Sequence, residues 1–379
     1  MRQVVVLGIG QTQFGRFKGV RYDVLGAQAA KAAIADAGID PKEIQVAYGS
    51  RVNAGLTTIQ DCLRHVGITE IEMINTENAC GSGISGAHCL WKDIAYGVYD
   101  VGIVVGAETL SEIPKGTLAS PRDLDGILGQ SMPSYFALKA RRFLDCRGAT
   151  AEDLAYPSYK NHKNATMNPY AQYKKELSIE EIVNSRMISD PVTLLECCPS
   201  SDGAAAVILC SEEFARKYTT RMIRIASSTI FSGGYEDPQR DILFDEPVYK
   251  LAQKAYKAAG IGPEDLDLVE LHDAFSPEEI WSYESLGLCP FGEAIPYMRK
   301  GTFDIGGKCA VNPSGGLLSL GHPAGASGVR VICEVAQHLR GEAGGRQQEG
   351  AKVGMAQMIG GYVAGLTAPA AGGIMILNR

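Results

Sequence analysis

Asn78-Ala79-Cys80-Gly81-Ser82-Gly83-Ile84-Ser85-Gly86 is the stretch of sequence that decides the fold of this chain. Residues 71–74 before it are mostly apolar and predict a strand, and residues 82–96 after it predict a helix. A cysteine at the start of a helix lies near the positive end of the helix dipole, which lowers the pKa of its thiol and favours a nucleophile. The alternative is a buried structural cysteine, the usual fate of a free thiol. This stretch alone favours neither interpretation.

A second segment repeats this layout: Gly321-His322-Pro323-Ala324-Gly325-Ala326-Ser327-Gly328. When Cys80 is aligned with His322, three later positions also carry the same residue. They are Gly83 with Gly325, Ser85 with Ser327, and Gly86 with Gly328. The two residues are therefore expected at the heads of two equivalent helices. Because a histidine activates a thiol as a base, or holds it as a thiolate, the pair indicates a nucleophilic site.

Two further pairs of segments match in the same order, residues 37–44 with 259–266 and residues 100–106 with 352–358. The first pair shares a glycine that ends a helix and a proline just beyond it. The spacing is too long for a solenoid repeat, so two homologous α/β halves are predicted. Strands alternate with helices in each half, which predicts largely parallel sheets covered by helices.

The strands are expected at residues 4–7, 46–49, 71–75, 103–105, 205–209, 223–226, 268–271, 353–357 and 374–377, and helices at residues 24–37, 82–96, 248–259, 277–286 and 327–339. Residues 108–199 interrupt the first half and are rich in polar and aromatic residues. This segment is too long for an ordinary loop. We expect an inserted subdomain that covers the site and binds substrate.

The composition excludes several classes of function. Of the 379 residues, 45% are hydrophobic and 21% charged, as in ordinary globular proteins. The net charge of −7, without blocks of like charge, argues against a nucleic-acid-binding protein, and no apolar stretch is long enough to span a membrane. The ten cysteines show no metal-ligand spacing, and scattered thiols without a signal peptide indicate a cytoplasmic protein.

Five signatures together resemble those of the thiolases, in the family's order and over the full length of the chain. They are Glu77-Asn78-Ala79-Cys80-Gly81-Ser82-Gly83, Ser201-Asp202-Gly203-Ala204-Ala205-Ala206, His272-Asp273-Ala274-Phe275, Asn312-Pro313-Ser314-Gly315-Gly316 and the segment that contains His322. The His-Asp start of the third signature is similar to the sterol-carrier and archaeal type. The resemblance implies an α/β fold with five αβαβα layers, two duplicated halves and a homodimeric core. The implied domains are residues 1–107 with 200–222, the loop domain 108–199, and residues 223–379.

By this resemblance the chain is a CoA-dependent acyltransferase. Cys80 would attack the 3-keto carbon of a 3-oxoacyl-CoA, and coenzyme A would then take the acyl group from the cysteine. His322 would activate Cys80, while His272 would help to form an oxyanion hole whose wall Asn312 shapes. The reverse Claisen condensation uses the same site. Coenzyme A is a co-substrate, and neither a separate cofactor nor a metal is implied.

The resemblance also implies a binding site for the substrate and coenzyme A. Its residues would be Ser314, Gly315, Gly316, Phe275 and Gly361. The small, apolar loop at residues 362–373 would reshape the acyl pocket for a bulky, aromatic or branched group, as in the degradation of a benzoylsuccinyl-CoA-like substrate. A small partner subunit with an OB-fold and a zinc ribbon is also implied.

One departure concerns the proton at the α-carbon. Many thiolases carry a second cysteine for it, in a Cys-x-Gly near the C-terminus or directly after His-Asp. This chain has Met-Ile-Gly-Gly-Tyr at residues 358–362 and Ala274 in those places. The candidates that replace the thiol are the two histidines and the hydroxyl of Tyr362, although a tyrosine after Gly-Gly is more often a packing residue. Cys289 is a further thiol, but it follows a helix.

Two alternatives to thiolysis stay open. The missing second cysteine and Tyr362 favour a thiolase-fold aldolase, which cleaves a 3-hydroxyacyl-CoA without a covalent intermediate, whereas Cys80 and His322 count against it. The other alternative is a non-catalytic subunit that binds an acyl-CoA. Such a subunit would have no physical need of Cys80, His272, Asn312 and His322 together.

Overall fold

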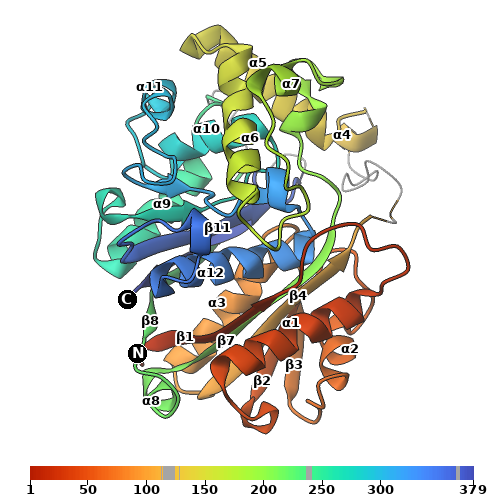
Figure 1. Ribbon diagram of the computed structural model, residues 1–379, viewed down its shortest axis with the longest axis vertical. Coiled ribbons are helices and arrows are strands. Elements are labelled where there is room, and N and C mark those ends of the chain that lie inside the picture. Colours follow the sequence, from red (N-terminus) through yellow and green to blue (C-terminus); the bar gives the residue numbers. More distant parts are fainter. Residues whose placement is uncertain (112, 114–123, 128, 236–240, 364–367) are drawn as a thin grey trace.

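The computed structural model describes residues 1–111, 113, 124–127, 129–235, 241–363 and 368–379. Within them, ten strands form one mixed sheet (Figure 1). In chain order these strands are β1 (Val4–Gln11), β2 (Val46–Ser50), β3 (Glu72–Thr76), β4 (Val101–Thr109), β7 (Asp202–Ser211), β8 (Ile223–Ser232), β9 (Leu268–Glu270), β10 (Ala310–Val311), β11 (Val353–Gly360) and β12 (Ala371–Asn378). Their order across the sheet is β10-β9-β11-β12-β8-β1-β7-β4-β2-β3.

The two ends of this sheet are built alike. From the edge inward the first half runs β3-β2-β4-β7-β1 and the second runs β10-β9-β11-β12-β8. The corresponding neighbours are parallel or antiparallel in the same pattern in both halves. The halves join where Val5 and Val6 of β1 pair with Arg224 and Ile223 of β8. The duplication predicted from the sequence is therefore present in the topology.

The prediction of largely parallel sheets is wrong. Only β2 with β3 and β4, and β9 with β10 and β11, form parallel pairs, and all other neighbours in this sheet are antiparallel. Antiparallel neighbours need no helical crossover between them, and β11 is followed directly in the chain by β12. The short strand β10 was also missed, because two residues carry no usable periodicity.

The helices cover both faces of each half. They are α1 (Tyr22–Ala37), α2 (Thr58–Arg64), α3 (Ser82–Ala95), α8 (Glu212–Ala215), α9 (Glu246–Ala259), α10 (Ser276–Ser285), α11 (Ala294–Arg299) and α12 (Ala324–Arg340), with short turns η1 (Pro41–Glu43), η3 (Pro263–Asp265), η4 (Gly316–Leu320) and η5 (Gly344–Arg346). α1 and α2 pack on the outer face of the first half, and α9 packs on the second. α3 and α12 contact each other and strands of both halves. The layers are therefore αβαβα, as the thiolase resemblance implied.

The two central helices touch backbone to backbone. A Cβ atom added to Gly83 would lie 2.5 Å from the backbone nitrogen of Val329, and one added to Gly328 would lie 2.6 Å from that of Ile84. Only glycine permits this approach. Gly83 is the second residue of α3 and Gly328 the fifth residue of α12, so this contact near the heads of both helices brings Cys80 and His322 together.

Most strands of the sheet are buried on both faces, which explains their continuous apolar runs, whereas the edge strand β3 is exposed or half-buried along its length. Successive side chains of β1 point to opposite sides of the sheet. Val4 and Val6 belong to the central core with α3 and α12, whereas Val5 and Leu7 belong to the core under α1 and α2. The two halves thus share one apolar interior around the central helices.

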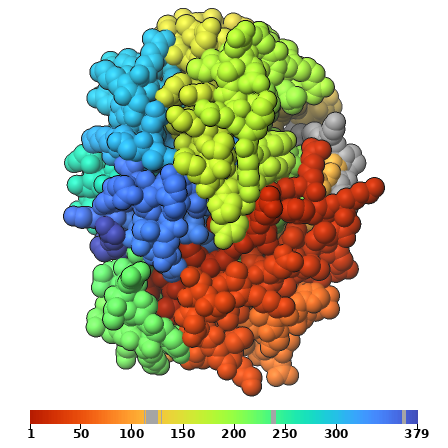
Figure 2. Space-filling model, in the orientation of Figure 1, coloured from red at the N-terminus to blue at the C-terminus, as the bar shows by residue number. Residues whose placement is uncertain are grey.

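The inserted segment lies between β4 and β7. It contains α4 (Leu124–Ile127), α5 (Met132–Arg147), α6 (Ala151–Ala165), α7 (Ile179–Val183), the hairpin of β5 (Met187–Ser189) and β6 (Val192–Thr193), and the turn η2 (Leu194–Glu196). Its α5 and α6 contact α10 of the second half. Figure 2 shows this segment, in yellow and green, seated above the red N-terminal part and beside the blue C-terminal part. The domain boundaries at 107/108, 199/200 and 222/223 stay predictions. None of the described helices is both long and apolar enough to span a membrane.

Candidate active site

Cys80 lies in a tight turn between β3 and α3. Ala79 before it has a φ of 50°, a left-handed conformation that is uncommon outside glycine. Two hydrogen bonds hold this residue: its N–H donates to Glu77 Oε1 over 2.7 Å, and its carbonyl accepts from Ser82 Oγ over 2.6 Å. Behind the turn, a Cβ atom on Gly360 would lie 2.7 Å from the Cys80 backbone nitrogen. The turn and the end of β11 therefore fix the direction of the thiol.

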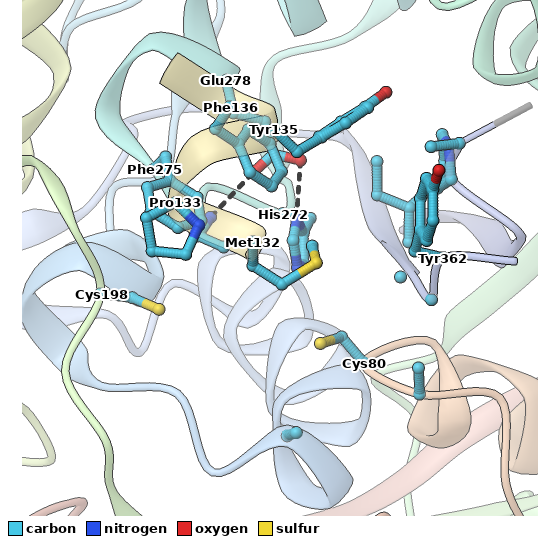
Figure 3. A pocket seen from close by; sticks show the side chains of 18 of the residues that line it. Cys80, Met132, Pro133, Tyr135, Phe136, Cys198, His272, Phe275, Glu278 and Tyr362 are labelled. Atoms are coloured by element: carbon cyan, nitrogen blue, oxygen red, sulfur yellow. Dashed lines mark hydrogen bonds and ion pairs between the residues drawn. The ribbon is translucent and has the colours of Figure 1, made fainter. Parts of the chain in front are cut away.

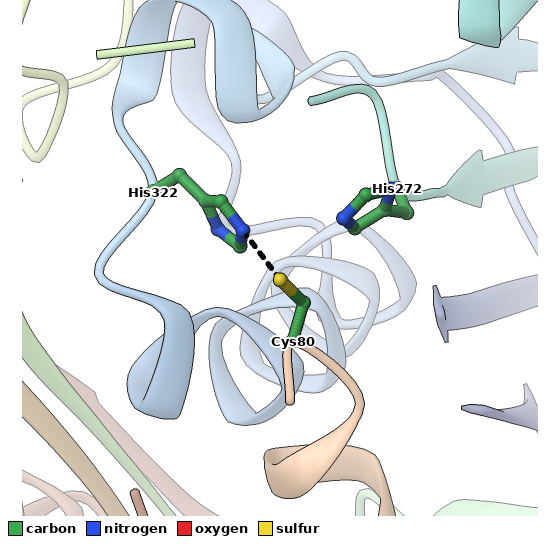
Figure 4. Close-up of side chains that lie close together, drawn as sticks. All are labelled: Cys80, His272 and His322. Atoms are coloured by element: carbon green, nitrogen blue, oxygen red, sulfur yellow. Dashed lines mark hydrogen bonds between the residues drawn. The ribbon is translucent and has the colours of Figure 1, made fainter. Parts of the chain in front are cut away.

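His322 is in direct contact with the thiol. Its Nε2 lies 3.0 Å from Cys80 Sγ, as the dashed line in Figure 4 marks. Its Nδ1 lies 2.9 Å from Ser327 Oγ, whose hydroxyl donates to the Pro323 carbonyl over 3.1 Å. Because that hydroxyl hydrogen is used, the serine oxygen accepts from Nδ1–H. Nε2 is then the nitrogen that takes the proton of Cys80.

His272 faces the same sulfur from the other side (Figure 4). Its Nδ1 lies 2.9 Å from Glu278 Oε1, and the backbone N–H of Ala274 donates to Glu278 Oε2 over 2.9 Å. Its backbone N–H donates to Gln357 Oε1 over 2.8 Å. The remaining ring atom, Nε2, is buried and has no hydrogen-bond partner among the described residues. A buried donor without a partner is costly, so this nitrogen is suited to an oxygen of a ligand.

The thiol of Cys80 and the imidazole of His272 carry opposite charges at neutral pH. Burial alone would raise the pKa of Cys80, but the charge of His322, its bond with the thiol and the nearby charge of His272 outweigh burial and lower the pKa to about 6. Burial alone would lower the pKa of His272, but the charges of Glu278 and Cys80 raise it to about 10. Between these values the site holds a thiolate beside an imidazolium.

The same three side chains have the geometry of a metal site. The ligand atoms of Cys80, His272 and His322 all lie within 4.8 Å of one another. A carboxylate bonded to the far nitrogen of a histidine, as Glu278 is here, is the usual support of a metal-bound imidazole. The predicted absence of a metal from the reaction stays a prediction.

The three residues open into a cavity of about 630 Å³. Its wall carries the predicted residues Phe275, Gly361 and Tyr362 and further aromatic side chains from α5 and α10, among them Tyr135, Phe136 and Trp281. The ring of Phe275 stacks on Phe136 with 4.4 Å between centroids, and Tyr362 lies 5.9 Å from Tyr135. In Figure 3 the hydroxyl end of Tyr362 points away from Cys80. The residues at 364–367 of the predicted pocket loop lie outside the described residues, but Ala368 and Pro369 line the cavity.

Asn312, Ser314, Gly315 and Gly316 are not among the residues that line the cavity in this structure, and their predicted role in binding stays a prediction. Asn312 accepts from the backbone N–H of Leu271 over 2.9 Å and donates to Glu279 over 2.7 Å, which uses both ends of its amide.

Ser314 and Gly316, which follow Asn312 in the same loop, also contact other residues of the protein interior. Ser314 is bonded to Glu270 over 2.7 Å and to Arg330 over 2.7 Å. A Cβ on Gly316 would lie 2.1 Å from Asp273. These contacts hold the backbone on both sides of His272 in place.

The residues of the cavity wall that were not predicted from the sequence include Lys139, Cys198, Asp245 and Glu278. Glu278 had a signal, because it is an acidic residue in the first turn of a predicted helix six positions after His272. Lys139 and Asp245 are far from the signatures in sequence, whereas Cys198 lies three residues before the signature that begins at Ser201. Cys289, named above as a further thiol, is buried in a different part of the second half and lines a separate hollow.

Comparisons with known proteins agree with this geometry. The family model "Thiolase, N-terminal domain" matches residues 4–213, and the model "Thiolase C-terminal domain-like" matches residues 236–368. The chain is 42% identical to the benzoylsuccinyl-CoA thiolase subunit BbsB of Thauera aromatica, across 95% of each. It is 39% identical to an acetyl-CoA acetyltransferase of Methanothermobacter thermautotrophicus, across 95% of this chain and 97% of that one.

Among solved structures, an Ltp2-ChsH2(DUF35) aldolase is similar to this chain with a TM-score of 0.87. The sequence identity is 26%, and the similarity covers 100% of this chain and 98% of the other. Together with the duplicated topology and the paired Cys80 and His322, the matches of both family models have one explanation. The chain belongs to the thiolase family of acyltransferases.

Proposed function

We propose that this enzyme cleaves a 3-oxoacyl-CoA with coenzyme A through an acyl group held on Cys80. One observation carries the proposal: Cys80 Sγ lies 3.0 Å from His322 Nε2, and the unpartnered Nε2 of His272 faces the same sulfur. A thiolate, a base and an unused donor thus converge at one end of an apolar cavity. This set is what acyl transfer to a thiol requires.

In the first step the Cys80 thiolate attacks C3 of the substrate. The C2–C3 bond then breaks, so that the acyl group stays on Cys80 and the shorter CoA ester leaves as its enolate. His272, protonated at neutral pH, donates from Nε2 to the oxygen that gains negative charge. A proton added at C2 completes the first product. Coenzyme A then attacks the acyl group, its thiol proton passes to His322, and Cys80 is restored as a thiolate.

Three groups are candidates for the proton donor at C2: His322, His272 and Tyr362. The two histidines already serve the sulfur and the substrate oxygen in this scheme. Tyr362 lines the cavity two residues after Gly360, which packs on Cys80. Replacing Tyr362 with Phe tests its role, because an unchanged kcat would remove it from the mechanism.

The acyl group is proposed to be bulky, aromatic or branched, and the reaction degradative. Support comes from the aromatic wall formed by Phe136, Phe275 and Trp281. The ring centroid of Phe136 lies 4.4 Å from that of Phe275 and 6.2 Å from that of Trp281. It also comes from the relative named as a benzoylsuccinyl-CoA thiolase subunit. That name and the name of the Ltp2-ChsH2(DUF35) aldolase support a small partner subunit, and a homodimeric core is part of the same proposal. Ten free thiols suit the cytoplasm, which stays our proposed location.

A second candidate is cleavage of a 3-hydroxyacyl-CoA by an aldolase mechanism. The observation that favours it is the likeness to the Ltp2-ChsH2(DUF35) aldolase. That reaction needs a base for the 3-hydroxyl and forms no acyl-enzyme. It gives no role to the contact between Cys80 and His322, so we rank it second. A non-catalytic subunit explains that contact no better.

Intact-protein mass spectrometry tests the proposal. The wild type and Cys80→Ala are mixed with a panel of 3-oxoacyl-CoAs, and coenzyme A is added afterwards. We expect an acyl adduct on the wild type only, which coenzyme A removes, and its mass identifies the acyl group. Cleavage of a 3-hydroxyacyl-CoA without coenzyme A and without any adduct would favour the aldolase instead.

A further inference from the structure

A buried ion pair lies in the wall of the cavity that contains Cys80. Lys139 of α5 contacts Asp245, the residue before α9, through Nζ and Oδ1. Their side chains are only 5% and 7% exposed, and both line the cavity. Burial of two charges costs several kcal/mol per ion, and their attraction repays it only with good geometry. A charged pair among aromatic residues therefore calls for an explanation.

A row of aromatic rings leads from the catalytic histidine to this pair. Phe275 follows His272 by three residues and stacks on Phe136, and both rings lie beside His272 in Figure 3. Phe136 stacks in turn on Trp281 with 6.2 Å between centroids. The Nζ of Lys139 lies 4.5 Å from the centre of the Trp281 ring. The pair thus stands at the end of the row that is farthest from His272.

The pair has hydrogen-bonding capacity left for a ligand. Within the described residues, the ammonium of Lys139 contacts the Asp245 carboxylate and the Trp281 ring, and an ammonium carries three donors. A carboxylate ligand would be attracted by Lys139 but repelled by Asp245, and an amine would meet the reverse. A neutral hydroxyl accepts from the lysine and donates to the aspartate at the same time. It is the group that suits both charges.

We propose that Lys139 and Asp245 bind a hydroxyl group on an aromatic acyl group whose ring lies along Phe275, Phe136 and Trp281. The inference rests on the proposed function, because the ring enters as the acyl part that Cys80 receives. The substrate class is a 3-oxo-3-(hydroxyphenyl)propanoyl-CoA. Sites built to bond a substrate hydroxyl reject the analogue that lacks it by as much as roughly 10⁴-fold. We expect a preference of at least about tenfold here, since the pair keeps its mutual contact when no hydroxyl is present.

A purely structural role for the pair makes a different prediction. The pair joins α5 of the inserted segment to the C-terminal half, and the ion pair of Arg299 with Asp153 does the same between α11 and α6. The latter pair forms hydrogen bonds of 2.9 Å and 2.6 Å and does not line the cavity. Because Arg299 is 56% exposed, this pair is a control for the loss of a tie between the two parts of the chain and not for the loss of a fully buried pair. If both pairs are only structural ties, removing either one lowers stability and leaves substrate preference unchanged. If Lys139 and Asp245 form a subsite, removing that pair alone changes substrate preference.

The experiment compares three full-length proteins: the wild type, Lys139→Met/Asp245→Asn and Arg299→Met/Asp153→Asn. Each double variant removes both charges, so that no buried charge is left alone. The measurement is the ratio of kcat/KM for thiolysis of the 3- or 4-hydroxyphenyl substrate to that of the unsubstituted phenyl substrate. We expect a ratio of at least about ten in the wild type and the control, and about one in Lys139→Met/Asp245→Asn.

A binding measurement keeps the test valid if the variant folds poorly. In Cys80→Ala protein, which cannot be acylated, 4-hydroxybenzoyl-CoA should bind at least about tenfold more tightly than benzoyl-CoA and 4-carboxybenzoyl-CoA. Equal affinities, or tightest binding of the carboxylate, would overturn the inference. Turnover of acetoacetyl-CoA without any aromatic substrate would overturn it together with the proposed acyl class. Failure of every 3-oxoacyl-CoA would overturn the proposed function itself.

Discussion

Replacing His322 with Gln should restore an ordinary thiol at Cys80. The imidazole Nε2 lies 3.0 Å from Sγ, and with His272 it lowers the pKa of the thiol from 9.0 to about 6. A pKa difference of about 3 corresponds to about 4 kcal/mol in favour of the thiolate. Glutamine is similar in size but neutral, so the attraction of His322 disappears, while burial remains and only His272 still opposes it. We expect the pKa of Cys80 to rise to 9 or above.

The rate of alkylation at a single pH would show this change poorly. At pH 7 about 90% of a thiol with a pKa of 6 is ionised, against about 1% at a pKa of 9. However, the nucleophilicity of a thiolate rises with its pKa, with a Brønsted coefficient of about 0.4–0.5, which returns roughly 20-fold. The rate at pH 7 should therefore fall only about 4–5-fold. The pH at which the rate reaches half of its maximum is the sharper measurement.

The assay follows iodoacetamide alkylation of the Cys80 peptide by mass spectrometry from pH 5 to pH 10. In the wild type the half-maximal rate is expected near pH 6, and below that value the rate should fall about tenfold per pH unit. In His322→Gln the half-maximum is expected at pH 9 or above. Cys80→Ala corrects for the exposed Cys146. A wild-type midpoint near 9, or the same midpoint in both proteins, would refute this account of the site.

Three further predictions follow from the same structure. Glu278→Gln removes the charge that holds the proton on His272, so kcat for thiolysis should fall about 10²–10³-fold, and a change below threefold would exclude an oxyanion role for that histidine. Gly83→Ala drives a methyl group to within 2.5 Å of the α12 backbone and should lower the free energy of unfolding by about 1–3 kcal/mol. A Cβ atom on Gly234 would have no heavy atom of the described residues within 4 Å, so Gly234→Ala should change the free energy of unfolding, measured by denaturant titration, by less than about 0.5 kcal/mol. Zn²⁺ should inhibit the wild type reversibly, with chelator restoring activity, and calorimetry should show weaker zinc binding in Cys80→Ser.

The duplicated parts of the fold were the predictable ones, because matched segments carry the same local chemistry twice. α1 and α9 both end at an alanine before a glycine with φ near 70°, Gly38 at 67° and Gly260 at 71°. A repeated signal of this kind is stronger than either copy. Strand direction carries no comparable signal, since an apolar run buried on both faces reads the same in a parallel or an antiparallel neighbourhood. This is why the mixed sheet was not foreseen.

The site residues also fall into those that could be predicted from the sequence and those that only the fold brings together. Cys80 and His322 stand at corresponding helix heads, so their pairing could be inferred from alignment alone. Asn312 was expected on the wall, because residue type does not reveal that both ends of its amide are already bonded. Lys139 and Asp245 are separated by 106 residues and belong to no signature, so only the fold brings them together.

The residues that carry out the chemistry and those that select the substrate come from different parts of the chain. The nucleophile and its base come from α3 and α12, and their distance depends on the backbone contact of Gly83 with Val329 between the two halves. That contact tolerates no added methyl group, so the geometry of attack is fixed by the duplicated core. Several of the side chains that line the cavity, including Tyr135, Phe136 and Lys139, stand instead on α5 of the inserted segment. A change on α5 can therefore alter which acyl group fits without moving Sγ relative to Nε2, and substitutions there should shift relative kcat/KM values among substrates while leaving the pH profile of Cys80 alkylation where it is.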